Sequence, residues 1–496
     1  MRRALAGLCA ALCVGAVAPA SSLASHSLRI GIADDGVLFH APDAAEIVAQ
    51  WKALGVDVAR VHVRWVSVAP ATNARRPPKR FDPWNPGDRH YHWGVVDHAI
   101  ELLRDAGIEP ILSVTGSGPL WSSTAPALGN PLWRPNARRF AAFATAVARR
   151  YGDAVTDYIV WNEPDQAGWL QPQFVCRGSR CTPESPHIYR WLFNAAAPAI
   201  RKADPGAQVL AGALAPRGSD PDARNSAMRP LTFLRAFGCV DGRYRPIRSG
   251  RCANFHAPLV DGISYHPHGV LRSPSQRNPQ RDEAAFADLG RLEFVLDRIA
   301  ARGGIRCTCA GQLPIHLTEF GYQTNPPDAY QGVSPAQQAR WLQEAGYLAW
   351  SDPRIKTLVQ YEWRDDPLLH KGSGKSAYAG WQSGLLYADS RPKPALSAFA
   401  NPFWVTASPG DPTVTLWGQV RPGDAHEVSV ERRLPGRDWR TLETVETDPF
   451  GAFTTALDLP SLAEVRFAYT VPGSTRSNAS EPVTVRRSVG VVVPPR

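Results

Sequence analysis

The sequence predicts an α/β fold, a (β/α)8 TIM barrel, followed by a small all-β sandwich of the fibronectin or immunoglobulin type. Strand-like apolar runs alternate eight times with helix-like stretches between Leu28 and Phe403, and this alternation ends after Pro402. A chain of 496 residues suits one large domain plus one small one. The predicted divisions are a signal peptide over residues 1–24, a barrel over 25–403 and a sandwich over 404–496.

Barrel strands are expected where short apolar runs are bounded by turn residues. The eight runs are Leu28–Ala33, Val58–Trp65, Glu109–Thr115, Asp157–Asn162, Gln208–Leu214, Gly262–His266, Pro314–Glu319 and Lys356–Trp363. Helices are expected where apolar residues recur at helical spacing. These stretches are Ala44–Leu54, Val95–Ala106, Ala137–Arg150, Ile188–Ala203, Pro230–Phe237, Glu283–Ala301 and Pro335–Trp350, with a weaker eighth at Pro394–Ala400. A closed barrel is the economical arrangement. The alternative is a doubly wound open sheet, but no G-x-G-x-x-G follows the first strand.

The region after Pro402 has the pattern of antiparallel strands. Short alternating segments separated by turn residues occur at Thr413–Gln419, Glu427–Arg432, Arg440–Thr444, Phe453–Leu457 and Val465–Thr470. Because this region has no cysteine pair between sheets, an immunoglobulin domain proper is disfavoured.

The first residues predict export. Three residues, Met1 to Arg3, are followed by an apolar run over Ala4–Ala20, and small residues allow cleavage after Ala20 or Ala24. An uncleaved anchor is the alternative, but the apolar run is short for a membrane span. We therefore expect a secreted protein, extracellular or at the cell surface, with no membrane span.

Six cysteines lie beyond the predicted signal peptide, and an even number in an exported chain indicates disulfides. Close spacing favours Cys176–Cys181 and Cys239–Cys252, which leaves Cys307–Cys309 as the third pair. Zinc binding is the weaker alternative, since the cysteines lack a paired C-x₂-C pattern.

The net charge of +10 does not predict a nucleic-acid partner. The densest basic run, Arg75 to Arg80, contains two prolines and has the composition of a solvated loop. No cluster of basic residues is interleaved with aromatic residues, as single-strand binding would require.

Two glutamates end predicted barrel strands, and barrel active sites lie at the carboxyl ends of strands. One strand ends in Trp161-Asn162-Glu163-Pro164 and another in Thr318-Glu319-Phe320-Gly321. Strand alternation predicts that Ile159, Trp161 and Glu163 share one face, and likewise Ile315, Leu317 and Glu319. Two carboxylates at the same end of one barrel are what glycoside hydrolysis needs.

These two segments resemble motifs of the clan A glycoside hydrolases, which are retaining (β/α)8 glycosidases. The segment 161–164 resembles the acid/base motif of the clan and 318–321 its nucleophile strand. Residues 111–114 together with 119–121 are most similar to family 39, and family 5 is also possible. The resemblance covers roughly residues 28–403. It implies an O-glycosyl hydrolase that cleaves β-linked bonds of an oligosaccharide, polysaccharide or glycoconjugate by double displacement, without a cofactor.

The resemblance also implies roles for single residues. Glu163 would be the general acid/base, Glu319 the nucleophile, and Asn162 would hydrogen-bond the 2-hydroxyl of the sugar. Arg64 would lie near Glu319 and help to keep it ionised, because a nearby cation lowers a carboxyl pKa. His266 would hydrogen-bond Glu319 or a sugar hydroxyl.

Four aromatic residues complete the expected binding site. The adjacent Tyr265 could take the place of His266, and Trp363 would form an apolar floor under the sugar. Trp121 lies on a strand-end loop, where its ring could stack on a sugar. Trp169 could do the same, and either of these two tryptophans could instead anchor its loop.

Two other functions fit parts of the sequence. A barrel could bind glycans without cleaving them. The H-x-H spacing of His266 and His268 also occurs in metal-dependent barrel hydrolases, where it lies on the first strand. Here the first strand lacks that pair, so no metal site is predicted.

Overall fold

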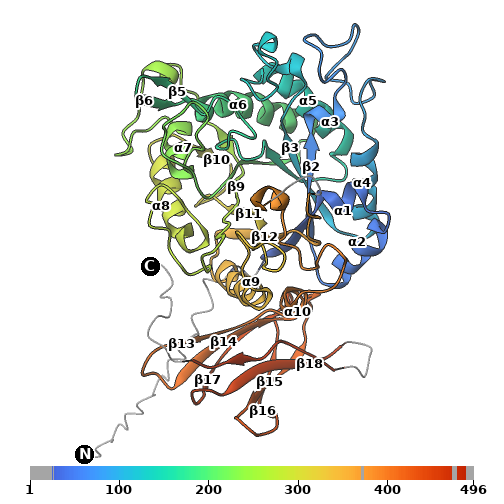
Figure 1. Cartoon of the computed structure of the whole chain (residues 1–496), viewed down its shortest axis with the longest axis vertical. Helices are drawn as coiled ribbons and strands as arrows, with labels where there is room; N and C mark the ends of the chain where they lie inside the picture. The colour runs from blue at the N-terminus through green and yellow to red at the C-terminus, as the bar shows by residue number, and fades with distance from the viewer. Residues whose placement is uncertain (1–24, 26, 370–373, 472–476, 487–496) are drawn as a thin grey trace, which may run out of the picture.

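The computed structural model describes residues 25, 27–369, 374–471 and 477–486. The predicted signal peptide, residues 1–24, lies outside them. Figure 1 shows a barrel surrounded by helices, with an all-β region packed against its lower edge in that view.

Eight parallel strands form the closed barrel, which confirms the predicted fold class. Their order around the barrel is the order in the chain, with the last strand beside the first. All eight predicted strands are present. They are β1 (Arg29–Ala33), β2 (Val58–Arg64), β3 (Glu109–Thr115), β4 (Asp157–Val160), β7 (Gln208–Leu214), β9 (Gly262–Tyr265), β11 (Ile315–Phe320) and β12 (Ile355–Tyr361).

The helices surround the barrel. They are α1 (Asp35–His40), α2 (Ala44–Ala53), α3 (Trp65–Val68), α4 (Gly94–Asp105), α5 (Ala137–Tyr151), α6 (Ser185–Ala203), α7 (Pro230–Phe237), α8 (Leu289–Ala300), α9 (Pro335–Trp350) and α10 (Pro394–Ala400). Helices α1 and α3 were not predicted, because they are too short to show a helical period. The Asp34 side chain caps α1 by accepting from the backbone N–H of Val37. The helix predicted from Glu283 begins only at Leu289.

Short elements connect these strands and helices. The two-stranded pieces are β5 (Phe174–Arg177) with β6 (Arg180–Pro183), and β8 (Leu259–Val260) with β10 (Arg306–Cys307). The 3-10 turns are η2 (Leu120–Ser122), η3 (Pro126–Leu128), η4 (Gly250–Cys252), η5 (Phe286–Asp288) and η6 (Gly374–Tyr378).

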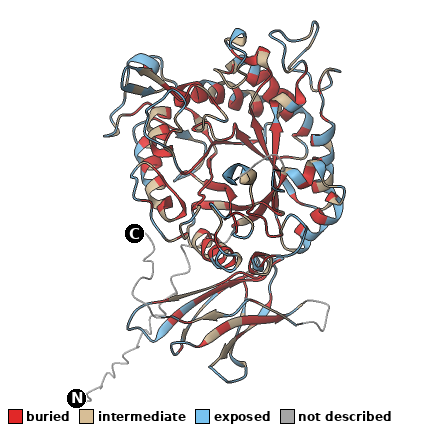
Figure 2. Cartoon of the chain, in the orientation of Figure 1, coloured by how far each residue is buried: buried red, intermediate tan, exposed pale blue. Residues whose placement is uncertain are grey.

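The barrel has two apolar layers. A small inner layer of Ala33, Val58, Ile111, Ile159, Leu210, Ala213 and Val359 fills the space enclosed by the strands. A much larger outer layer lies between the strands and the helices. Figure 2 shows buried residues along the strands and on the helix faces that contact them, with exposed residues on the outside. Strands buried on both faces explain the nearly continuous apolar runs of the sequence.

The region after Pro402 forms two antiparallel sheets around a separate apolar core. One contains β13 (Phe403–Ala407), β14 (Thr413–Gln419) and β17 (Ala452–Asp458), and the other β15 (Glu427–Arg433), β16 (Arg440–Glu446), β18 (Glu464–Thr470), β19 (Ser477–Ala479) and β20 (Val483–Thr484). Strand β13 was not predicted, because its three partly buried central residues give it no alternation of buried and exposed positions. The division at residues 403 and 404 stays a prediction.

The β region contacts the barrel at two places. The ring of Trp417 lies 5.9 Å from that of Tyr347 and 6.0 Å from that of Trp350, both in α9. At the second contact, the buried Arg421 donates to the backbone carbonyl of Phe399 at 2.8 Å. These contacts join the two regions along one edge of the barrel.

All three predicted disulfides form: Cys176–Cys181, Cys239–Cys252 and Cys307–Cys309. The first joins β5 to β6 across their turn. Because these sulfurs are bonded to one another, the zinc alternative has no free thiolates among these six residues. No helix in the described part of the chain is both long and apolar enough to cross a membrane.

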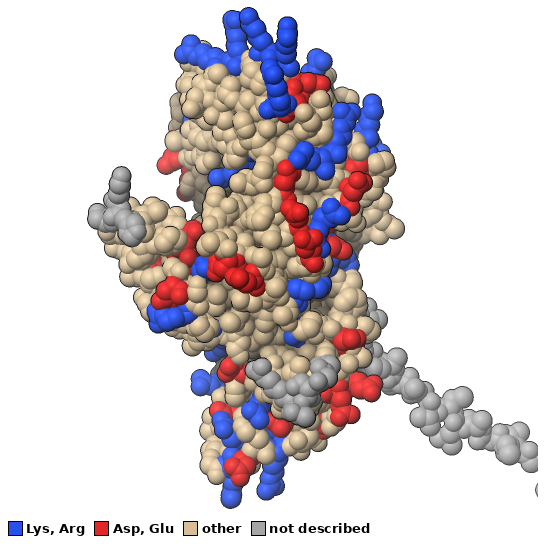
Figure 3. Space-filling view, turned by 90° about the vertical axis from the view of Figure 1, so that its right-hand side faces the viewer, with Lys and Arg blue, Asp and Glu red and all other residues tan. Residues whose placement is uncertain are grey.

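The basic run is exposed, as predicted. The side chains of Arg75, Arg76, Lys79 and Arg80 are all exposed on the loop between α3 and α4. Figure 3 shows acidic and basic side chains interspersed over this side of the molecule, with basic ones gathered at its upper end.

Candidate active site

Both predicted glutamates lie at the carboxyl end of the barrel, and His266 contacts both. Nδ1 of His266 lies 3.1 Å from Oε1 of Glu163 and 3.6 Å from Oε2 of Glu319. The nearest oxygens of the two carboxylates are therefore separated by no more than the sum of these two distances. The structure thus brings these three predicted site residues together.

Glu319 is held as a buried anion. Its Oε1 lies 2.6 Å from Nη1 of Arg60, and its Oε2 lies 3.5 Å from Nε2 of His268. Burial on its own raises a carboxyl pKa, but here the charges of Arg60, His266 and His268 outweigh it. The pKa of Glu319 consequently lies well below its usual range.

A chain of polar contacts orients Arg60. Its Nη1 donates to Nε2 of His62 at 2.9 Å. The proton of His62 is therefore on Nδ1, which donates to Oδ2 of Asp35 at 2.7 Å. Arg60 also donates to Oδ1 of Asn162 at 3.3 Å. Asn162 is buried, so its amide group is fixed beside the Arg60–Glu319 ion pair.

The expected position of Arg64 is wrong, because Arg60 makes the ion pair with Glu319. Both arginines belong to β2 and are an even number of residues apart, so they lie on the same face of the strand. Arg64, however, is the last residue of β2 and is exposed. Its guanidinium lies 5.2 Å from the ring of Trp169, at the rim of the barrel. The predicted arginine is therefore on the correct face of β2 but four residues too far along the strand.

The predicted shared faces are also wrong, because both strands become irregular near their ends. Trp161 and Glu163 have φ of 71° and 36°, so alternation stops after β4. The ring of Trp161 consequently packs on Phe140 of α5, with centroids 5.1 Å apart, in the outer layer. In β11 the pairing with β12 shifts between Leu317 and Phe320, and Leu317 lies in the outer layer.

Three predicted sugar contacts are buried away from the two glutamates, in the outer layer. Tyr265 is fully buried and donates to the carbonyl of Ala284 at 2.6 Å. Trp363 packs against Trp51 of α2, with ring centroids 6.3 Å apart. Tyr265 is the last residue of β9, where the pairing with β7 shifts register, and Trp363 lies beyond the end of β12 at Tyr361. Strand parity therefore does not give the orientation of either side chain.

Trp121 is the third of these. It is 2 % exposed, its Nε1 donates to the carbonyl of Pro70 at 2.9 Å, and its ring lies 5.9 Å from that of Trp65. Trp121 therefore anchors a loop instead of lining the site.

Two other tryptophans have partly exposed rings near the glutamates. Trp169, which the sequence analysis considered, stacks on His62 with centroids 5.7 Å apart. The ring centroid of Trp381 lies 5.0 Å from that of His268 and 5.5 Å from that of Tyr361. Trp381 was not predicted as a site residue, because it lies in a long loop after β12, in a stretch with no strand or helix pattern.

Beside the glutamates lies a pocket of about 400 Å³. His268 and Trp381 line it, together with Gly321, which comes two residues after Glu319. A space of this size is within the range of small-ligand sites.

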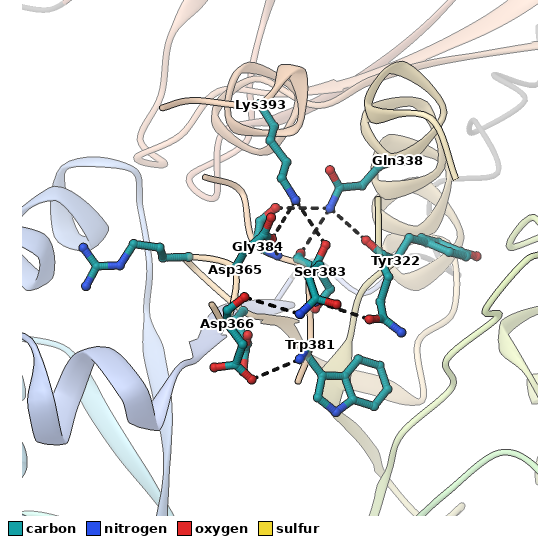
Figure 4. Close-up of polar contacts among 12 residues, drawn as sticks. Tyr322, Gln338, Asp365, Asp366, Trp381, Ser383, Gly384 and Lys393 are labelled. Carbon is teal, nitrogen blue, oxygen red and sulfur yellow. Dashed lines mark hydrogen bonds and ion pairs between the residues drawn. The ribbon is translucent and has the colours of Figure 1, made fainter. Parts of the chain in front are cut away.

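A buried polar network holds the segment that carries Trp381. Figure 4 shows Lys393, at the start of α10, pointing to Asp365, and Gln338 of α9 reaching the same segment. Nζ of Lys393 lies 2.6 Å from Oδ1 of Asp365, which also accepts from the backbone of Gly384 at 2.8 Å. The segment from Trp381 to Gly384 is thereby fixed from behind.

Lys393→Met is expected to destabilise the fold by about 3–5 kcal/mol, because it leaves the Asp365 carboxylate buried without a partner. Both side chains of the pair are almost completely buried. Urea-induced unfolding measures the loss. The double variant Lys393→Met/Asp365→Leu is the control and should recover most of the stability, since it removes both charges. A single variant as stable as the unaltered chain would contradict this role.

Three residues could together hold a metal ion: His266, His268 and Glu319 have ligand atoms within 4.8 Å of one another. Nε2 of His266 has no hydrogen-bond partner among the described residues. Arg60, however, already neutralises Glu319 at 2.6 Å, and a second cation there would meet its repulsion. The other group, His187 with Cys239 and Cys252, has its sulfurs in a disulfide.

Comparisons with known proteins give structural neighbours only. No protein-family model matches the chain, and no curated protein matches its sequence. A glucosidase from Croceicoccus marinus is 14% identical, with 88% of this chain and 94% of that one covered and a TM-score of 0.47. A family 1 β-glucosidase from Thermotoga maritima is 12% identical, with 75% of this chain and 96% of that one covered and a TM-score of 0.46. A β-glucuronidase from Bacteroides uniformis is 11% identical, with 93% of this chain and 46% of that one covered and a TM-score of 0.42. Likeness at this level carries no argument about activity.

Proposed function

We propose that this chain is a secreted retaining glycoside hydrolase of the clan A type, acting on β-linked glycans or glycoconjugates. The observation that carries the proposal is the contact of one histidine nitrogen with two carboxylates, those of Glu163 and Glu319. Double displacement requires the two carboxyl groups to lie about 5–5.5 Å apart and inversion about 6.5–9.5 Å, and we propose the shorter separation for Glu163 and Glu319. The charges around Glu319 lower the pKa of its carboxyl group, which supports the nucleophile role for Glu319 because a nucleophile must be ionised. Glu163 then takes the acid/base role.

The reaction then has two steps. In the first, Glu163 gives its proton to the leaving oxygen as the glycosidic bond breaks, and a carboxylate oxygen of Glu319 bonds to the anomeric carbon. In the second, Glu163 takes a proton from water, whose oxygen attacks the same carbon and releases the Glu319 carboxylate. Asn162, whose Oδ1 accepts from Arg60, would hydrogen-bond the sugar. Two inversions give net retention.

The test of this mechanism is a screen of aryl β-glycosides and defined oligosaccharides, with the anomer of the first product followed by NMR. We expect the β-anomer to form first and to mutarotate later. A first-formed α-anomer would establish inversion and contradict double displacement.

Glu163→Gln is expected to lower kcat/KM by about 10²–10⁴-fold for a substrate with a poor leaving group, because general acid assistance is lost. For a 2,4-dinitrophenyl glycoside, whose leaving group needs little protonation, kcat/KM should change little. Initial rates on both substrates measure the difference. Equal losses on the two would rule out Glu163 as the acid.

A metal-dependent hydrolase is the second candidate, because His266, His268 and Glu319 form a possible three-ligand group. Treatment with a chelator followed by metal analysis separates the two proposals. Double displacement requires full activity in the chelated protein. A non-catalytic glycan-binding barrel would bind members of the same panel and release no product.

The proposal of secretion is supported by the composition of the first residues and by three disulfides, which persist in oxidising compartments. We also propose residues 25–403 as the catalytic unit and 404–496 as an accessory β-sandwich.

A further inference from the structure

The pocket beside the two glutamates has a basic lining. Arg217 follows β7, and Lys375 belongs to η6. In Figure 1 a short orange helix lies in front of the centre of the barrel, which matches η6 by its place in the chain. No aspartate or glutamate is among the lining residues. The cations thus approach the pocket from two elements that are far apart in the sequence.

These two cations have no carboxylate partner among the described residues. Both side chains are exposed, and neither belongs to an ion pair in the described ranges. The neighbouring Arg229 differs, because Asp220 lies 2.8 Å from it. Asp366 lies beside the pocket residue Gly380, and its side chain accepts from the backbone of Trp381 at 3.0 Å. Arg217 and Lys375 are therefore available to a negatively charged ligand.

The rest of the lining suits a sugar ring. Trp381 and Tyr378 offer aromatic faces, and the side chains of Gln323 and Gln331 offer amide groups for hydroxyls. His268 joins this pocket to Glu319 at 3.5 Å. A sugar in the pocket would therefore lie next to the reacting centre.

We infer that this pocket binds a sugar that carries an anionic substituent, a carboxylate or a sulfate, with Arg217 and Lys375 as its partners. The inference rests on the proposed function and names the substrate class of that site. Arginine and lysine side chains recognise negatively charged oxygens through charge-assisted hydrogen bonds. Arg217 and Lys375 are thus residues of specificity, and the chemistry stays with the two glutamates.

The experiment measures binding without turnover, by calorimetry on the full chain with three non-hydrolysable probes. These are phenyl 1-thio-β-D-glucoside, its 6-O-sulfate, and phenyl 1-thio-β-D-glucuronide, which share one skeleton and differ at carbon 6. At least one anionic probe should bind about tenfold more tightly than the neutral one, and the preference should shrink on going from about 50 to about 500 mM NaCl. The probe that is preferred identifies the substituent as a carboxylate or a sulfate.

Variants assign the preference to the pocket. Arg217→Gln/Lys375→Gln should abolish it, so that this variant binds the anionic probes no more tightly than it binds the neutral probe. The control Arg302→Gln/Arg437→Gln removes two exposed charges outside the pocket and should keep the preference. The inference is overturned if no anionic probe binds more tightly than the neutral one, or if the preference survives in the pocket variant. Since binding needs no catalysis, hydrolysis of neutral glycosides with no anionic preference would overturn the inference alone. Anionic preference without any hydrolysis would overturn only the proposed function.

Discussion

Glu319→Gln is expected to lower kcat/KM at least about 10⁴-fold on every substrate that the chain hydrolyses, because the amide cannot form the covalent intermediate. The residue is 6 % exposed and contacts Arg60, His266 and His268, so no water or neighbouring carboxylate can easily take its place. Initial rates on the best substrate of the aryl glycoside panel measure the loss.

Two further variants separate chemistry from folding. Glu319→Ala leaves space for a small anion, and added azide should restore turnover and yield a glycosyl azide of inverted configuration. Glu344→Gln is the matched control, because Glu344 is also a buried carboxyl group but lies in α9. Burial raises the pKa of Glu344, so the neutral amide is a close replacement and activity should persist. A Glu319→Gln variant that kept a tenth of the activity would exclude the nucleophile assignment.

Arg60→Met is expected to move the acid limb of the pH profile of kcat/KM upward by roughly 1–3 units, because a neighbouring cation lowers a carboxyl pKa by that amount. The nucleophile must be ionised, so activity is lost as the pH falls through the pKa of Glu319 in the free enzyme. Removing Arg60 raises this pKa, and the loss then begins at a higher pH. A full pH profile of kcat/KM measures the shift.

Arg64→Met is the control for this prediction. The variant removes an arginine from the same face of β2. The guanidinium of Arg64 stacks on Trp169 and makes no ion pair with Glu319 in the described structure. The acid limb of the pH profile of kcat/KM should lie at the same pH in Arg64→Met as in the unaltered chain. If Arg64→Met shifted the limb and Arg60→Met did not, the assignment of the ion pair would be reversed.

The fold was predictable because parallel strands covered on both faces leave a strong signal. Residues such as Val61 and Leu112 face helices while Val58 and Ile111 fill the barrel, so whole strands are apolar. The positions of Glu163 and Glu319 were predictable for a related reason. A polar residue that ends such a run lies at the mouth of the barrel, whichever way the run is oriented.

Side-chain direction and depth at the strand ends were not predictable. The positive φ of Trp161 turns its ring to the helices, against the direction that alternation predicts. Arg60 and Arg64 share one face, and only the stagger between neighbouring strands decides which one reaches Glu319. Trp381 reaches the site through a loop whose position depends on Lys393 and Asp365, and no local pattern records such a contact.

The contact between the barrel and the β region bears on how the chain could have evolved. Trp417 packs beside Tyr347 and Trp350, and Arg421 donates to a backbone carbonyl near the end of α10. Exchange of the β region for an unrelated module would leave two aromatic rings and a helix end in water. Recombination that keeps the barrel and replaces the β region is therefore disfavoured. We expect the two regions to be inherited as one unit.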